Sequence, residues 1–108
     1  MKFFILFTIL SSAVQSLYFY QCHSRNQPST SITQTLFKRC KPRNPQVWHY
    51  SQSISAIGTP SPGGYSIDCL RRGCKYFGLR LRRKECGDYD IMKDKCDRWV
   101  GEKWINID

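Results

Sequence analysis

The chain has 108 residues, of which 17 are Lys or Arg and 8 are Asp or Glu, so its formal net charge at pH 7 is +9. This length excludes an arrangement of several large domains, and this charge favours anionic partners such as nucleic acid, acidic lipid or an acidic protein face. After the first residues, no apolar run approaches the about 20 residues that a membrane-spanning helix needs. The composition therefore predicts one small basic domain without a transmembrane span.

The N-terminal stretch MKFFILFTILSSAVQS has the layout of a secretory signal peptide. Lys2 precedes an apolar run, and small and polar residues follow it. Val14 and Ser16 suit the two small-residue positions before a cut, so we expect cleavage after Ser16. The expected products are a signal peptide over 1–16 and a single mature domain over 17–108, which keeps 16 basic and 8 acidic residues. We expect the protein to be secreted and extracellular, and it could then be delivered into host cells.

The cysteines all lie in the predicted mature domain, at Cys22, Cys40, Cys69, Cys74, Cys86 and Cys96. An even number behind a signal peptide indicates disulfides, here three, and six cysteines allow 15 pairings. Zinc binding is disfavoured because no C-x-x-C occurs, and we expect neither a metal nor another cofactor. A mature chain of this size buries only about 60–65% of its unfolded surface, so the disulfides would carry much of the stability.

The first half of the mature chain predicts strands around one helix. Aromatic residues over 17–22 favour a short strand, and a polar loop follows. Apolar residues over 30–40 recur on one helical face, after Ser29 or Thr30 as the helix cap. A strand is predicted over 47–50, and the Gly- and Pro-rich residues 58–64 predict a turn between two antiparallel strands.

The second half predicts a hairpin, a helix and a closing strand. The second strand of the hairpin is expected over 65–69, with a turn over 70–73 and a returning strand over 74–83. The spacing of apolar residues then changes to a helical period over 88–100, where Asp88 or Asp90 can cap the start. The closing strand comes from the Trp104–Ile107 segment. Together these elements predict an α+β, disulfide-stabilised domain, with an antiparallel sheet of four or five strands and one or two packed helices.

The basic residues concentrate between Cys69 and Cys86. In the predicted returning strand, Phe77 shares a core-facing side with Leu79 and Leu81, whereas Tyr76 lies on the solvated side with the arginines. A solvated strand face is the ordinary explanation for such alternation. Basic side chains with an aromatic ring on a sheet also suit single-stranded nucleic acid, and an anionic membrane or wall polymer would use the same charges without the stacking. The candidate anion- or partner-binding residues are Arg71, Arg72, Lys75, Tyr76, Arg80, Arg82, Arg83 and Lys84.

Catalytic groups are scarce in the mature chain. Metal-free RNA cleavage needs a general base, a general acid and a cation near the phosphate, and only His49 and Glu85 with one of the arginines could supply them. No spacing links these residues into a motif, and His49 is equally an ordinary strand residue. We expect His23 to be a surface residue. Trp48, Trp99 and Trp104 are interpreted as core or near-core anchors.

A short motif, Tyr20-Gln-Cys22, follows the predicted cleavage point. A signal peptide followed by Tyr/Phe/Trp-x-Cys resembles the small secreted candidate effectors of powdery mildew and rust fungi. Many of those resemble catalytically inactive members of the fungal guanyl-ribonuclease fold. The resemblance implies a host-directed protein with an early helix and an antiparallel sheet, without a working nuclease site. It also implies that the first cysteine bonds one near the C-terminus, which would pair Cys22 with Cys96 or Cys86.

Three function classes follow from these observations. The favoured one is a secreted cationic effector-like protein that binds a host protein or RNA as a monomer, without catalysis. The second is a cationic antimicrobial or killer-type toxin that acts on anionic membranes or walls. The third is a secreted ribonuclease, for which His49 would be the catalytic candidate.

Overall fold

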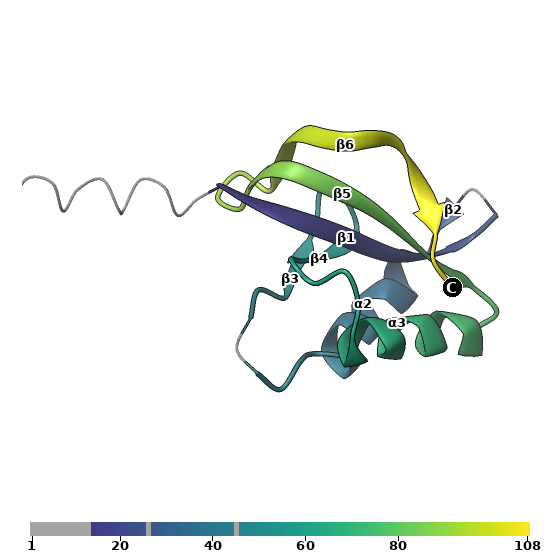
Figure 1. Ribbon diagram of the computed structural model, residues 1–108. Helices are drawn as coiled ribbons and strands as arrows, with labels where there is room; N and C mark the ends of the chain where they lie inside the picture. The colour runs from purple at the N-terminus through teal and green to yellow at the C-terminus, as the bar shows by residue number, and fades with distance from the viewer. Residues whose placement is uncertain (1–13, 26, 45) are drawn as a thin grey trace, which may run out of the picture.

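The protein is an antiparallel sheet with both helices packed on one of its faces (Figure 1). The computed structural model describes residues 14–108 except 26 and 45, and within them it contains two helices and a six-stranded sheet. The strands are β1 (Val14–Ser24), β2 (Gln27–Pro28), β3 (His49–Ser51), β4 (Ala56–Thr59), β5 (Arg80–Asp90) and β6 (Lys95–Asn106). The helices are α2 (Thr30–Arg39) and α3 (Tyr65–Tyr76). The predicted α+β class is confirmed.

The strand order in the sheet is β3-β4-β1-β5-β6, and the short β2 pairs with the end of β1. The succession β1-α2-β3-β4-α3-β5 is the split β-α-β arrangement of ferredoxin-like domains, to which β6 adds an edge strand through a hairpin. β1 is central, and its partners on both sides run antiparallel to it. This topology leaves the sheet face opposite the helices, here called the open face, without a covering helix.

The core under the helices combines alternate residues of the central strands with one face of each helix. Tyr20 and Cys22 of β1 and Leu81 of β5 point to this side because alternate strand residues share a face. Leu36 of α2 and Leu70 of α3 pack against them, and each is 1% exposed. Burying such side chains stabilises the fold by about 1.5–3 kcal/mol each.

The strand predicted over 65–69 and the turn predicted over 70–73 are wrong, because residues 65–76 form α3. Ile67, Leu70 and Cys74 are the buried residues of this helix, and their spacing of three and four is helical. Phe77, predicted to lie in the core, is the C-cap of α3 and is 43% exposed. The returning strand begins at Arg80, after Gly78 has taken a positive φ of 74°.

The helix predicted over 88–100 is also wrong, because β5 continues to Asp90 and β6 begins at Lys95. The Asp90 carboxylate caps the turn between these strands instead of a helix: its Oδ1 accepts the backbone N–H groups of Met92 at 3.0 Å and Lys93 at 3.2 Å. The closing strand expected from Trp104 onward is confirmed as the last part of β6.

All six cysteines lie within the described residues, and they form three disulfides there. The observed pairs are Cys22–Cys74, Cys40–Cys69 and Cys86–Cys96. The expected pairing of Cys22 with Cys96 or Cys86 is therefore wrong. Cys22 faces the helices and reaches α3, whereas Cys86 lies on the open face and joins β5 to β6.

Positions 1–13 of the predicted signal peptide lie outside the described residues, and Val14 and Gln15 pair with Asp90 and Tyr89 at the start of β1. In the part of the chain that is described, neither helix has the length and apolar character to cross a membrane.

Candidate functional site

The open face carries a row of cations along β5. Arg80, Arg82 and Lys84 alternate with Leu81, which is buried against the helices, so the three basic side chains share the opposite side of the strand. Residues two apart on one strand lie about 6.6 Å from each other. Arg80 is well exposed and lies 4.0 Å from the carboxylate of Asp108, whereas Arg82 and Lys84 are half-buried.

Two tryptophans of β6 lie beside this row. The Arg82 guanidinium carbon is 5.1 Å from the centroid of the Trp104 ring, and the Lys84 ammonium is 4.6 Å from that of Trp99. The two indole rings are 6.2 Å apart. Such cation–π contacts are worth about 0.5–1 kcal/mol each at exposed sites. We call these four residues the cation–indole strip.

Arg82 is held in place on its β1 side as well. Its Nε donates a hydrogen bond of 2.7 Å to Oε1 of Gln21. Burial lowers the pKa of Arg82 below its usual value, and a guanidinium nevertheless stays charged at neutral pH. The side chain is therefore a positioned cation whose remaining N–H groups can reach an anion.

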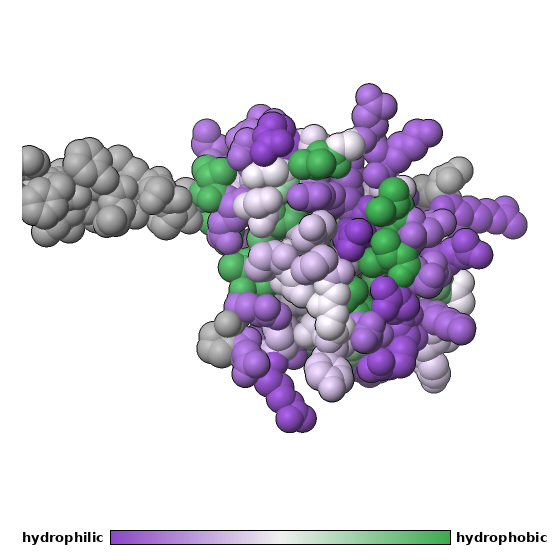
Figure 2. Space-filling model, viewed as in Figure 1, coloured by the Kyte–Doolittle hydropathy of each residue, from purple (hydrophilic) through white to green (hydrophobic). Residues whose placement is uncertain are grey.

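The other predicted anion-binding residues fall into two groups. Arg72, Lys75 and Tyr76 are exposed on α3, and the Tyr76 ring, 81% exposed, forms an edge contact with Phe77 at 5.0 Å. Figure 2 shows long hydrophilic side chains projecting from the side where α3 ends and β5 begins, with hydrophobic atoms between them. This group lies at the end of the sheet, apart from the strip.

Arg71 and Arg83 serve mainly to hold the fold together. Arg71 donates to the Asp68 carboxylate at 2.6 Å and to the Ile107 carbonyl at 2.8 Å, which ties the C-terminal segment to α3. Arg83 points to the helix-covered side, because it alternates with Arg82 and Lys84. There it donates to the Pro62 carbonyl at 3.2 Å.

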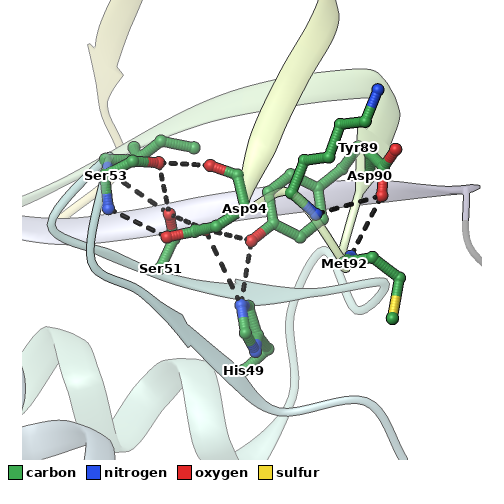
Figure 3. Close-up of polar contacts among 9 residues, drawn as sticks. His49, Ser51, Ser53, Tyr89, Asp90, Met92 and Asp94 are labelled. Atoms are coloured by element: carbon green, nitrogen blue, oxygen red, sulfur yellow. Dashed lines mark hydrogen bonds and ion pairs between the residues drawn. The ribbon is translucent and has the colours of Figure 1, made fainter.

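A hydrogen-bonded cluster joins the β5–β6 turn to β3 (Figure 3). His49 Nε2 lies 2.8 Å from the Tyr89 hydroxyl, which donates to the Asp94 carboxylate. The same carboxylate accepts from the hydroxyl of Ser51 and, at 3.0 Å, from the backbone N–H of Ser53. The polar groups of the cluster bond to one another, which is the arrangement of a structural clasp.

The clasp shifts two pKa values. Burial, reinforced by the neighbouring Asp94 carboxylate, raises the pKa of Tyr89. Burial also acts to raise the pKa of Asp94, but hydrogen bonds from Ser51, Tyr89 and Ser53 outweigh it and hold that pKa below its usual value. Asp94 is thus an ionised acceptor at neutral pH.

The structure does not bring the two catalytic candidates together. His49 lies on the open face of β3, whereas Glu85 lies on the other face of β5, beside a groove of about 420 Å³ that Tyr18 and Val100 also line. Two strands lie between β3 and β5, so the two residues are separated by about 14 Å across the sheet. They cannot contact one phosphate together.

Two sequence interpretations need correction here. His23 is 6% exposed, and its ring nitrogens contact the Arg25 carbonyl and the Asn106 side chain, both at 2.7 Å, so it is not a surface residue. Trp99 and Trp104 pack against the open-face cluster, as near-core anchors would, but their other role, the pairing with Arg82 and Lys84, was missed. The pairing of β6 with β5 places these rings beside the cations. The sequence predicts a helix over 88–100, so this strand pairing was not expected.

No protein-family model matches the chain with significance, and neither does any curated protein or solved structure. Among the described residues, no group of three or more His, Cys, Asp or Glu side chains could hold a metal ion. The chemistry of the surface therefore provides the basis for assigning a function.

Proposed function

We propose that this protein is a non-catalytic binding module whose open face engages single-stranded RNA. The observation that carries the proposal is the cation–indole strip, in which Arg82 and Lys84 lie against Trp104 and Trp99. Phosphates would pair with the cations, and bases would stack on the parts of the indole rings that the packing leaves accessible. Base–aromatic stacking contributes about 1–3 kcal/mol per base and tolerates any sequence.

The surroundings of the strip support an anionic ligand. Arg80 extends the row of cations at one end, and the net charge of +9 draws a polyanion toward the molecule from a distance. The centre of this face is closed, because Phe19 and Gln21 of β1 are buried there, so an extended strand of nucleotides would follow β5 and β6 along the strip.

Binding is favoured over cleavage because His49 and Glu85 lie on opposite faces of the sheet. The predicted signal peptide and the Tyr20-Gln-Cys22 motif support a secreted, host-directed role of the effector type. In that role the host partner would be RNA, and an acidic host protein is the alternative that the experiments must distinguish.

The proposal is tested by measuring the fluorescence anisotropy of a labelled single-stranded RNA with the oxidised protein. Replacing Arg80→Ala together with Arg82→Ala should weaken binding tenfold or more, because two phosphate contacts and one indole contact are lost. The slope of log affinity against log salt should become shallower by about 1.4, which is the value for two contacts to a single strand. Thermal unfolding of the variant verifies that the domain remains folded.

A matched control removes the same charge elsewhere. Lys38→Ala with Lys93→Ala changes exposed residues on α2 and in the β5–β6 turn, away from the strip. This variant should bind RNA within about threefold of the wild type. Equal losses in the two variants would mean that net charge alone drives the association, and the strip would not be the site.

The competing functions give different results. Capture of a host protein that survives nuclease treatment, without RNA affinity, would favour an acidic protein partner. Leakage of anionic vesicles that is weakened by high salt would favour a membrane-active toxin. RNA cleavage that disappears in His49→Ala would favour a ribonuclease and would contradict the proposed absence of catalysis.

A further inference from the structure

A second basic surface lies at the opposite end of the helices from Tyr76, in a cavity between the residues that follow α2 and the start of α3. Its volume is about 820 Å³, within the range of small-molecule sites. Three cations line it, namely Arg39, Lys41 and Arg43, and the described lining residues include no Asp or Glu. None of the sequence-predicted binding residues belongs to this cavity.

The cations of the cavity are available to a ligand. Arg39, Lys41 and Arg43 are exposed, and none of them takes part in an ion pair within the described part of the chain. Arg39 lies in the last turn of α2, where its positive charge stabilises the helix by interacting with the negative end of the helix dipole. Lys41 and Arg43 come after the helix has ended, so helix stabilisation does not account for them.

The walls of the cavity are joined covalently. Cys40, between Arg39 and Lys41, forms a disulfide with Cys69 of α3, and both half-cystines line the cavity. The disulfide fixes the basic wall against α3 before any ligand arrives. Such preorganisation lowers the ordering cost of binding.

The remaining lining residues define the ligand further. Ser66 supplies a hydroxyl group that can donate to a phosphate oxygen, whereas the Ser61 hydroxyl already donates to the Gly63 carbonyl. The Tyr65 ring borders the cavity and is 94% exposed, so both of its faces can be reached. Cations, hydroxyls and an accessible ring together suit a phosphate group that is attached to a planar base.

We propose that this cavity binds a small phosphate-bearing ligand through Arg39, Lys41 and Arg43, with Tyr65 as a stacking surface. The site is separate from the cation–indole strip, so it does not depend on the proposed function. Inorganic phosphates and nucleotides share the recognised group, and they differ in whether Tyr65 contributes.

Calorimetric titration of the oxidised protein with inorganic pyrophosphate and with a nucleoside diphosphate tests the site. Both should bind saturably, and Lys41→Gln with Arg43→Gln should weaken each about tenfold or more, because hydrogen bonds to charged groups are lost. If the nucleotide is the source of the phosphate, it should bind more tightly than pyrophosphate, and Tyr65→Ala should remove that advantage, roughly fivefold or more. Equal affinities for the two probes would support the site and assign free phosphate as its ligand.

Two controls make the result specific. Lys38→Gln with Lys93→Gln removes the same charge outside the cavity and should leave both affinities within about twofold. Arg80→Ala with Arg82→Ala should do the same here, although it is expected to weaken RNA binding. The proposal is overturned if neither probe saturates at millimolar concentration, or if the Lys38 and Lys93 control loses as much affinity as the cavity variant.

Discussion

The two faces of the sheet are built by different means. The helix-covered face is closed by aliphatic side chains such as Leu36 and Leu81, each 1% exposed, and by two disulfides that span 52 and 29 residues of sequence. The open face relies on aromatic edges, the clasp around Asp94 and a disulfide that spans 10 residues. The open face also buries a core cluster around Phe19 and Tyr89, and its cations and half-buried rings lie at the edge of that cluster.

Removal of disulfides should give the largest difference in stability between the two faces. Cys22→Ser with Cys74→Ser opens the 52-residue link under the helices and should lower the free energy of unfolding by about 4 kcal/mol. Cys86→Ser with Cys96→Ser opens the 10-residue link and should cost about 3 kcal/mol. Urea unfolding of the two double variants measures the difference. A larger loss for the hairpin pair would show that the open face contributes more to stability than its partner.

Two glycines compare the packing under the helices with the packing of the exposed β5–β6 hairpin. A Cβ at Gly73 would lie 2.4 Å from Cδ2 of the buried Leu36, which has no room to move. Gly73→Ala should therefore destabilise by roughly 1–2 kcal/mol, even after the gain in helix propensity of about 1 kcal/mol. The three atoms nearest to a Cβ at Gly87 belong to the guanidinium of Arg98, which is exposed and pairs with Asp88 at 3.0 Å. Gly87→Ala would displace this surface ion pair and should cost less than about 1 kcal/mol. Similar losses in thermal unfolding would contradict the contrast.

Two tyrosine hydroxyls give a smaller and sharper test. Tyr89→Phe removes the group that links His49 to Asp94 on the open face, and it should cost about 1 kcal/mol. The hydroxyl of Tyr50, on the helix-covered side, is buried without a hydrogen-bond partner among the described residues. Tyr50→Phe should consequently be neutral or slightly stabilising. Both are measured by urea unfolding, and a reversed order would mean that the clasp contributes nothing.

The smallest expected effect is a pH dependence that originates at Asp94. Its pKa is lower in the folded protein than its unfolded value of about 3.9, so its contribution to stability is full above that pH. The contribution is lost as the pH falls through the folded pKa. The stability advantage of the wild type over Asp94→Asn should thus shrink below about pH 4. A constant advantage down to pH 2 would exclude this mechanism.

The spacing of apolar residues predicts the fold correctly where either the helical or the strand period clearly dominates. The sequence predicts the first strand and α2 correctly. Aromatic residues indicate the strand, apolar residues on one helical face indicate the helix, and no competing period occurs in either segment. Over α3 the sequence pattern also fits a strand, because Tyr65, Ile67 and Cys69 alternate, although Ile67, Leu70 and Cys74 carry the helical spacing. A pattern that satisfies both periods is decided by tertiary packing, here the approach of Leu36 to Gly73.

The candidate site was predicted in part, for the same reason. The alternation of Arg80 and Arg82 is confirmed, because residues 80–83 of the strand predicted over 74–83 belong to β5, although that strand begins six residues later than predicted. The tryptophan partners were not found, because pairing between β5 and β6 depends on a turn that Asp90 caps and that resembles a helix start in the sequence. The disulfide pattern was equally out of reach, since it depends on which face each cysteine occupies.

β6 has a further consequence for the behaviour of the protein in concentrated solution. Its pairing with β5 is interrupted between Val100 and Ile105, where Gly101 takes a φ of 88°. An edge strand interrupted in this way offers no long straight ladder to a second chain, and positively charged Lys103 lies within the interruption. Edge-to-edge stacking of β6 into fibrils is thereby discouraged, and this edge should not drive aggregation at high protein concentration.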